Sequence, residues 1–181
     1  QTFLEKHPMV SHGRDYFTTD GIVSDKDRLL RDVFDEIKEH LTGGLVNKSK
    51  NLLEAIRMEC YDRGQLEKQP DRIYVSNGVL FLDGKFREEK DFCLNRLPVA
   101  YNPDAPKPEV WLRFLSELLE PEDILTLQEF MGYCLIPSTK GQAMLLLKGN
   151  GGEGKSRIGV VLHTLFGVNA KNGSIAKLES S

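Results

Sequence analysis

Two segments in the first third of the chain carry apolar residues at steps of three and four, the spacing of one helix face. These positions are Leu29, Leu30, Val33, Phe34, Ile37 and Leu41 in the first segment, and Leu52, Leu53, Ile56 and Cys60 in the second. Asp25 or Ser24 can cap the first helix, and Gly43-Gly44 is expected to end it. The pattern predicts two amphipathic helices, whereas residues 1–24 show no clear period and are expected to form an irregular lead-in.

Short apolar runs separated by glycine-containing pairs come next. The runs are Ile73-Tyr74-Val75, Val79-Leu80-Phe81-Leu82 and Lys85-Phe86-Arg87. Asn77-Gly78 and Asp83-Gly84 lie between them, and both pairs accept the positive φ angles of a two-residue type I′ turn. We therefore expect a three-stranded β-meander. Together with the two helices it would form a module of residues 25–105.

Prolines and renewed helical periods organise residues 106–140. An extended connector is expected where Pro98, Pro103, Pro106 and Pro108 cluster. Two apolar helix faces follow, formed by Trp111, Leu112, Phe114, Leu115, Leu118 and Leu119, and then by Ile124, Leu125, Leu127, Phe130 and Met131. Pro121 opens the second helix and Pro137 closes it. The pattern predicts a helical hairpin, and we assign its aromatic stripe to the core rather than to a ligand site.

The last region, residues 141–181, begins with the apolar run Ala143-Met144-Leu145-Leu146-Leu147. A short continuous run bounded by polar residues and glycine predicts a buried strand. A helix is expected to begin near Lys155 and to end just before Gly167. Its apolar positions are Ile158, Val160, Val161, Leu162 and Leu165.

Between this strand and helix stands the sequence Gly149-Asn150-Gly151-Gly152-Glu153-Gly154-Lys155-Ser156, which fits the P-loop pattern G-x-x-x-x-G-K-[ST]. Glycines let the backbone wrap closely around a phosphate, so that consecutive N–H groups donate to its oxygens. The positive end of the following helix faces the same anion. We therefore predict that these eight residues and Arg157 bind ATP, with Lys155 as the catalytic lysine at the β- and γ-phosphates and Ser156 as a Mg²⁺ ligand.

Composition narrows the possibilities further. The net charge is -3 and the sequence pI about 5.9, so a contact with nucleic acid would need a local patch rather than an overall basic surface. No apolar run approaches the ~20 residues of a membrane span. These features, with no signal-peptide pattern, lead us to expect an intracellular, cytoplasmic protein that does not contact a membrane.

Catalysis by a P-loop NTPase requires more than this motif. An acidic residue on a second strand and an arginine near the γ-phosphate are usually needed, and no apolar run ending in Asp or Glu follows Ser156. We therefore expect an α/β fragment of a larger protein. Its α+β module of helices and meander would precede the start of a P-loop ATPase core. Such a fragment is not expected to be active alone.

The residues up to and including the P-loop contain, in order, Asn77-Gly78-Val79-Leu80, Leu97 to Ala105, the Trp111/Phe114-Leu115 helix, Glu122-Asp123-Ile124, Gln128 to Tyr133, and the P-loop itself. In this order the pieces resemble the phage and plasmid primase–helicase family of helicase superfamily 3, to which poxvirus primase–helicases are related. In that family the P-loop begins an AAA+-like ATPase core. The pieces span about residues 72–167. Glu153 departs from the family, which often has Asn there, and we expect its carboxylate to point towards solvent.

The resemblance implies an ATP-dependent replicative DNA helicase of a phage, plasmid or other mobile element. In that family the full-length protein is typically a hexameric ring that encircles single-stranded or forked DNA and moves along it using ATP and Mg²⁺. A primase domain is often attached, although no primase motif is visible here. Gly149, Gly154, Lys155 and Ser156 match the nucleotide-binding motif of the family directly.

Two alternatives stay open on the sequence. A P-loop kinase or phosphotransferase would carry a substrate lid with arginines downstream, and DNA would not stimulate its ATPase activity. A non-catalytic adaptor that binds DNA or protein would contain a P-loop that does not respond to Mg-ATP.

Overall fold

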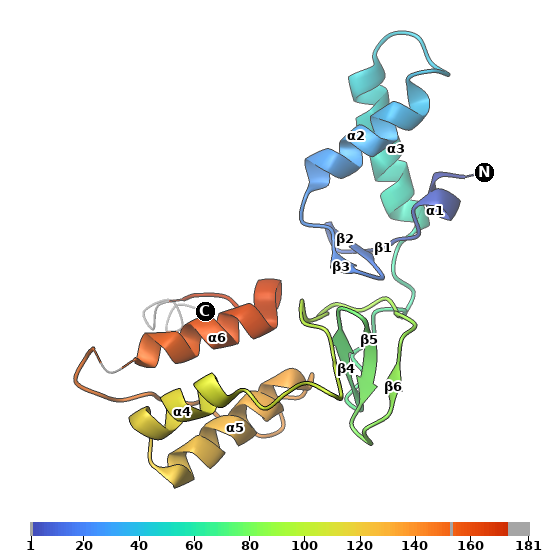
Figure 1. The fold of residues 1–181 in the computed structure, drawn as a ribbon. Coiled ribbons are helices and arrows are strands. Elements are labelled where there is room, and N and C mark those ends of the chain that lie inside the picture. The colour runs from blue at the N-terminus through green and yellow to red at the C-terminus, as the bar shows by residue number, and fades with distance from the viewer. Residues whose placement is uncertain (1, 153, 174–181) are drawn as a thin grey trace. The chain divides into compact units, whose positions relative to one another are not determined.

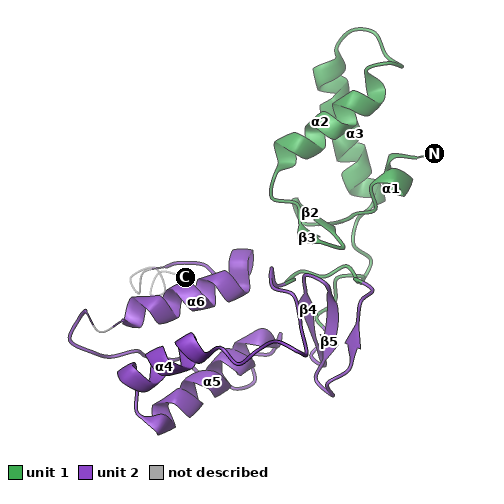
Figure 2. Cartoon of the chain, viewed as in Figure 1, with its two compact units in different colours: residues 1–68, 90–96 green, residues 69–89, 97–181 purple. Residues whose placement is uncertain are grey.

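A computed structural model describes residues 2–152 and 154–173 of the chain. In this part it has a mixed α+β fold with six α-helices and two antiparallel three-stranded sheets (Figure 1). The chain divides into two compact units: unit 1 contains residues 1–68 and 90–96, and unit 2 contains residues 69–89 and 97–181 (Figure 2). The β-meander thus lies in a different unit from the two helices that precede it.

Unit 1 begins with regular structure rather than with the irregular lead-in expected for residues 1–24. Its elements are α1 (Phe3–Lys6), β1 (Val10–His12), β2 (Asp15–Thr18), β3 (Gly21–Ile22), α2 (Lys26–Ile37) and α3 (Leu45–Glu59). The three strands form an antiparallel sheet in which Phe17 of β2 pairs with Val10 on one side and Ile22 on the other. Strands of two to four residues are too short to show a period in the sequence, which is why they were missed.

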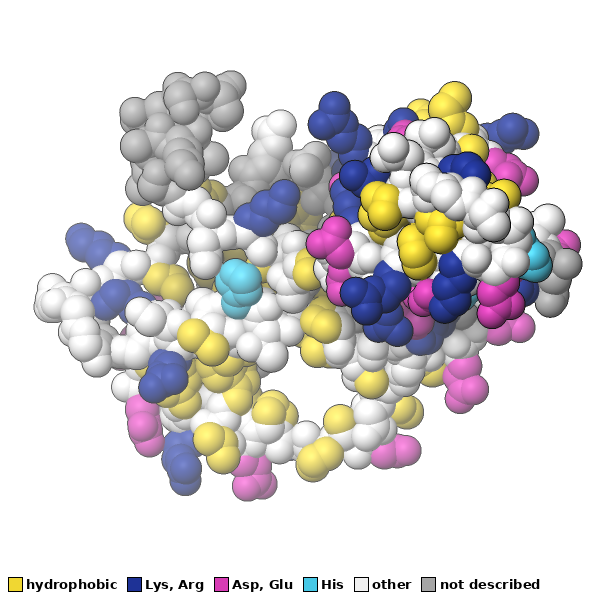
Figure 3. Space-filling view, turned by 90° about the horizontal axis from the view of Figure 1, so that it is seen from above, with side chains coloured by type: hydrophobic (Ala, Val, Ile, Leu, Met, Phe, Trp, Pro, Cys, Tyr) yellow, Lys and Arg dark blue, Asp and Glu magenta, His cyan; other side chains and the backbone are white. Residues whose placement is uncertain are grey.

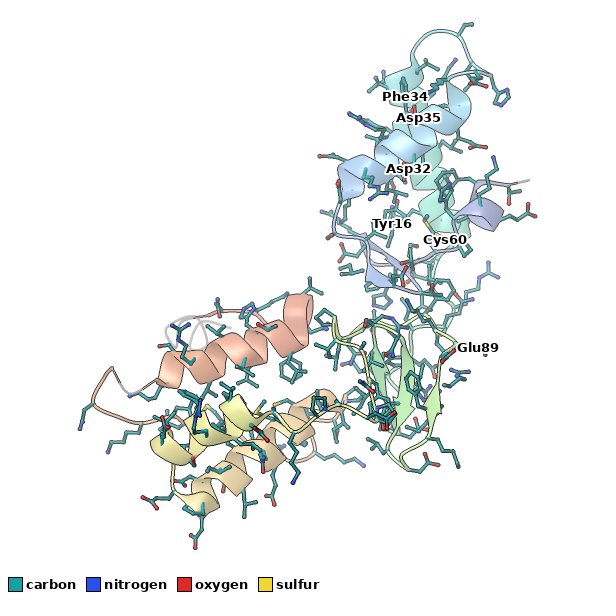
Figure 4. All side chains as sticks on the ribbon, in the orientation of Figure 1. Tyr16, Asp32, Phe34, Asp35, Cys60 and Glu89 are labelled. Atoms are coloured by element: carbon teal, nitrogen blue, oxygen red, sulfur yellow. The ribbon has the colours of Figure 1, made fainter. Side chains whose placement is uncertain are left out.

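The core of unit 1 lies where this sheet meets the two helices. Met9 and Tyr16 are buried together with Leu29 and Val33 of α2 and Ile56 of α3. The Tyr16 hydroxyl donates a hydrogen bond to the Leu53 carbonyl at 3.2 Å. Figure 4 shows Tyr16 and Cys60 between the sheet and the helices. Desolvation by burial raises the pKa of Tyr16, so this hydroxyl remains a neutral donor.

The start of α2 is confirmed and its end is corrected. The Asp25 carboxylate accepts a hydrogen bond from the Arg28 amide at 2.8 Å and so caps the helix. The helix ends at Ile37, so Leu41 lies beyond it and is 40% exposed. Gly44, with φ of 63°, is the N-cap of α3. The glycine pair therefore precedes the second helix instead of closing the first.

The β-meander of unit 2 is confirmed as β4 (Arg72–Val75), β5 (Gly78–Phe81) and β6 (Phe86–Arg87). The type I′ turns are not formed. Val75 pairs with Gly78, so the first turn contains Ser76 and Asn77, and neither has a positive φ. Asn77 instead donates its side-chain amide to the Tyr101 carbonyl and accepts from the Tyr101 amide, both at 2.9 Å. Its side chain therefore fixes the following connector rather than the turn.

The predicted helical hairpin is present as α4 (Glu109–Leu118) and α5 (Pro121–Leu135). Leu115 of α4 and Leu127 of α5 are 0% and 1% exposed and share a core cluster with Ile158. Leu125, expected on the same face, is 61% exposed.

The apolar run at 143–147 is not a strand, which corrects the expectation of a buried one. None of the strands among residues 2–152 and 154–173 pairs with this run. Leu145 and Leu147 pack against the Leu115 cluster, while Met144 and Leu146 are 85% and 79% exposed. The run therefore has the alternation of a strand without the hydrogen bonds of a sheet. The parallel core that would make the fold α/β is not seen among the described residues.

The helix expected after the P-loop is present as α6 (Lys155–Phe166), followed by a 3₁₀ turn (Gly167–Asn169). Gly167 is its C-cap at φ of 54°, as the sequence suggested. Within the described ranges, no helix combines the length and the apolar character needed to cross a bilayer.

Candidate nucleotide-binding site

The loop before α6 has a backbone that requires glycine. Gly151, Gly152 and Gly154 have φ angles of 97°, 73° and 90°. A Cβ added at Gly151 or Gly152 would meet nothing within 4 Å, so conformation rather than crowding selects glycine at these two positions. The loop therefore depends on glycines in a left-handed conformation, and at Gly151 and Gly152 the space beside the backbone is open.

The sequence-predicted site residues lie in one continuous segment. Gly149, Asn150, Gly151 and Gly152 are exposed; Gly154 and Lys155 are half-buried; Ser156 and Arg157 are exposed on the first turn of α6. Glu153, whose side chain was expected to point towards solvent, lies outside the described residues. The order of loop and helix is as predicted, and the strand before them is the part that is missing.

The beginning of α6 is suited to an anion. Its N-cap is Gly154, which has no side chain to bond the first-turn amides. The Arg157 amide donates to the Gly154 carbonyl at 2.8 Å. The amide dipoles of the first turn and the helix dipole together favour negative charge at such a position. Phosphate oxygens are the chemical groups that such a terminus commonly binds in proteins.

Phe114 of α4 lies against this loop, and α4 and α5 share a core cluster with the helix that follows it. A Cβ added at Gly154 would lie 3.0 Å from Cε2 of Phe114, so the Phe114 ring contacts the loop directly. One turn further along α6, Ile158 is 0% exposed in the cluster with Leu115 and Leu127. Sequence reasoning placed Phe114 in the core but gave no signal that it touches the P-loop, because the two are forty residues apart.

The family comparison covers a different part of the chain. Residues 22–120 match the family described as D5 N terminal like, and this match spans more than half of the 181 residues. The chain belongs to the D5 N terminal like family. No curated protein matches the chain. The D5 N-terminal-like domain is found in phage and plasmid D5-family primase–helicases.

The D5 N-terminal-like domain runs from β3 to just beyond α4, so it ends before the P-loop. It overlaps the region of resemblance expected from the sequence at residues 72–120, and it adds α2 and α3, which that resemblance did not include. The match therefore supports the family through residues upstream of the loop. It does not cover the P-loop, whose assignment depends on its own sequence and backbone geometry.

Two basic side chains in the helical part of the D5 N-terminal-like domain are paired with acidic ones. Arg57 is paired with Glu54 at 2.8 Å, and Lys38 with Asp35 at 2.9 Å. The view in Figure 3 shows Lys and Arg side chains interspersed with Asp and Glu. Pairing of this kind leaves little net positive potential for a phosphate backbone.

A metal-binding cluster and an activated thiol are two other features that could carry chemistry in the described residues. Among them there is no group of three or more His, Cys, Asp or Glu placed to hold a metal ion. Burial raises the pKa of the Cys93 thiol, which keeps it protonated and weakly nucleophilic. The P-loop segment is therefore the strongest candidate for chemistry in the described part of the chain.

Proposed function

We propose that residues 149–157 bind Mg-ATP, and that this chain is part of an ATP-dependent replicative DNA helicase of the primase–helicase type. The observation that carries the proposal is the P-loop sequence itself, held with positive φ at Gly151, Gly152 and Gly154 immediately before a helix. Membership of the D5 N terminal like family supports the helicase context.

Each part of the site has a defined role in this proposal. The loop amides bind phosphate oxygens, the Lys155 ammonium reaches the β- and γ-phosphates, and the Ser156 hydroxyl ligates Mg²⁺. Lys155 is the first residue of α6, so its charge lies at the positive end of the helix. Arg157 lies beside them on an exposed part of the same turn.

The remainder of the ATPase core lies outside the described structure in this proposal. Met144 and Leu146 are exposed on one side of the run at 143–147. A strand of a larger sheet would expose such residues when its neighbouring strands are absent. We infer that the run becomes a strand of an AAA+-like core in the full-length protein. That protein would form a hexamer around single-stranded or forked DNA of a phage, plasmid or other mobile element.

Thermal-shift titration with Mg-ATP tests the nucleotide site. A ligand at 100 times its dissociation constant stabilises a fold by about 2.7 kcal/mol, so the 181-residue chain should melt at a higher temperature. Lys155→Ala should remove the shift. Lys140→Ala is the matched control, because Lys140 is an exposed lysine of the same unit outside the motif, and it should keep the shift.

A wild-type chain that does not respond to saturating Mg-ATP would contradict the proposal and favour a non-catalytic adaptor. The helicase assignment is tested separately in the full-length protein. There Lys155→Ala should abolish ATP-dependent strand separation, and single-stranded DNA should stimulate ATP hydrolysis by the wild type. ATP hydrolysis that DNA leaves unchanged would point to a kinase or phosphotransferase instead.

A further inference from the structure

A groove in unit 2 shares Arg157 with the proposed nucleotide site, and its other lining residues lie outside that site. It has a volume of about 990 Å³ and a mostly apolar lining. Its walls come from the start of α4 and from α6, and the residues that matter here are Pro108, Trp111, Phe114, Arg157, Val160 and Val161. Its volume is at the upper end of the ~300–1,000 Å³ of ligand pockets in proteins. The sequence assigned the aromatic residues of α4 to the core, and the structure shows that they also face this groove.

The groove is connected to the P-loop through stacked aromatic rings. Trp111 and Phe114 stack with their ring centroids 5.5 Å apart and their planes 26° from parallel. The far side of the pair reaches the loop, since Phe114 lies against Gly154. Arg157 lines the groove and is the residue directly after Ser156. Phe114 and Arg157 therefore connect the groove to the loop, and Trp111 lies on the side of Phe114 that faces the groove.

The lining matches the chemistry of a nucleobase. A base has two apolar faces, which bury well against an indole ring and the aliphatic side chains Val160 and Val161. Its edge and the ribose carry hydrogen-bond acceptors, and Arg157 supplies donors in a fixed planar fork. Val160 is 55% exposed and Val161 36% exposed in the described structure, so apolar surface is left open that a bound base would cover.

We propose that this groove holds the base of the nucleotide, with Trp111 as the stacking residue. The inference rests on the proposed function, because it requires phosphates at the P-loop. It adds a base subsite that the P-loop motif does not contain. Because stacking on an indole is available to any aromatic base, the groove favours nucleotides over inorganic polyphosphate more strongly than it distinguishes one base from another.

The test compares Mg-ATP with Mg-tripolyphosphate, which carries the same three phosphates but neither ribose nor base. Trp111 is the only tryptophan, so tryptophan fluorescence reports on the surroundings of this one residue. Both ligands should raise the melting temperature, ATP should bind about tenfold more tightly, and only ATP should quench Trp111. Equal affinities, or quenching by both ligands alike, would overturn the base subsite while leaving the phosphate site intact. Binding of neither ligand would overturn the proposed function.

Substitution provides a second, independent readout by calorimetry. Trp111→Ala should weaken ATP about tenfold and leave tripolyphosphate unchanged, and Trp111→Phe should restore most of the ATP affinity because it keeps an aromatic face. Leu112→Ala is the matched control on the next position of α4, where the side chain is 37% exposed. Equal ATP affinity in Trp111→Ala and Leu112→Ala would overturn the assignment. The fluorescence comparison needs no substitution and holds even if Trp111→Ala does not fold.

Discussion

The family-matched region, residues 22–120, and the P-loop segment, residues 141–173, satisfy their own polar and apolar groups to different degrees. In the first, Asp25 caps α2 with its own carboxylate, and each strand of the meander is paired through a short turn. In the second, α6 starts at a glycine without a cap, and the run before it is covered on one side only. The first region completes its helix cap and its meander from nearby residues, whereas the second begins a helix without a side-chain cap and leaves Met144 and Leu146 of the apolar run exposed.

Connectivity explains this difference physically. Antiparallel strands such as β4 and β5 pair through a turn of two residues, so a short sequence contains all that is needed to complete them. A strand that leads into a P-loop pairs in parallel, and its neighbours arrive only after a crossover of a dozen or more residues. Leu145 and Leu147 can pack on the helices below, yet no local segment can supply their hydrogen-bond partners. The incomplete region is therefore the one that depends on distant sequence.

The largest expected effect tests whether the two regions share one core. Leu115 of α4 and Ile158 of α6 are both 0% exposed in the same cluster. Replacing either by Ala should lower the free energy of unfolding of unit 2 by about 2–5 kcal/mol, because each leaves a cavity. Urea unfolding followed by Trp111 fluorescence measures this, since Trp111 packs against the cluster.

Leu125→Ala provides the control for these two variants. Leu125 lies on α5 but is 61% exposed, so its truncation should change stability by less than about 0.5 kcal/mol. A similarly small effect for Ile158→Ala, beside a large one for Leu115→Ala, would mean that the P-loop segment does not depend on the hairpin. The stabilities of the two regions would then be independent of each other.

A somewhat smaller loss is expected from Gly78→Ala in the meander. A Cβ at Gly78 would lie 2.1 Å from the Arg87 carbonyl oxygen and 2.9 Å from Cζ of Phe86, so β5 and β6 would have to move apart. We expect a cost of about 2–3 kcal/mol, measured by the same urea unfolding. Gly84→Asn is the control, because an added Cβ there meets nothing within 4 Å and Asn tolerates the positive φ. Equal losses would show that φ, not crowding, sets the requirement.

The meander also shows where sequence reasoning succeeds and fails. Short apolar runs separated by Asn-Gly and Asp-Gly pairs were sufficient to predict three strands, because pairing between neighbours in sequence depends on local residues. The role of Asn77 was missed. Its side chain bonds Tyr101, twenty-four residues away, and a propensity for turns contains no information about such a partner. The same limit applies to Phe114 and Gly154, and to the strand expected at 143–147.

Removing the cap of α2 should have a moderate effect. Asp25→Ala deletes the carboxylate that accepts from the Arg28 amide and should destabilise unit 1 by about 1 kcal/mol. Faster hydrogen exchange of the first-turn amides of α2 would report it. Asp25→Asn or Asp25→Ser should retain most of the stability, since both side chains still accept. Unchanged exchange in Asp25→Ala would mean that the side-chain cap does not stabilise α2. The start of α2 would then not differ in this respect from that of α6, which has no side-chain cap.

A pH-dependent contribution is expected at the end of α3. Desolvation acts to raise the pKa of Asp62, but hydrogen bonds from the Leu66, Gln65 and Gly64 amides and from His12 together lower it below 3.8. The folded state therefore binds this proton less tightly than the unfolded state. The contribution is fully present above the unfolded pKa and is lost as pH falls through the folded pKa.

Asp62→Asn is the variant that isolates this contribution. It should be less stable than the wild type at pH 6, and the difference should shrink as the pH falls below about 4. Unfolding of unit 1 followed by circular dichroism between pH 6 and 2.5 measures it. A difference that stays constant over this range would show that the Asp62 carboxylate is not stabilised by its amide donors.

The smallest effect is expected at the exposed face of the apolar run, and it separates a strand-like element from a completed strand. Leu146 is 79% exposed, so Leu146→Thr should change the stability of unit 2 by less than about 0.5 kcal/mol. Leu145→Thr should cost clearly more, because Leu145 packs against the Leu115 cluster. Urea unfolding of the two variants compares adjacent residues of one type that differ only in the face they occupy. Equal losses would mean that both faces are covered in solution, and the P-loop segment would then be as closed as the family-matched region.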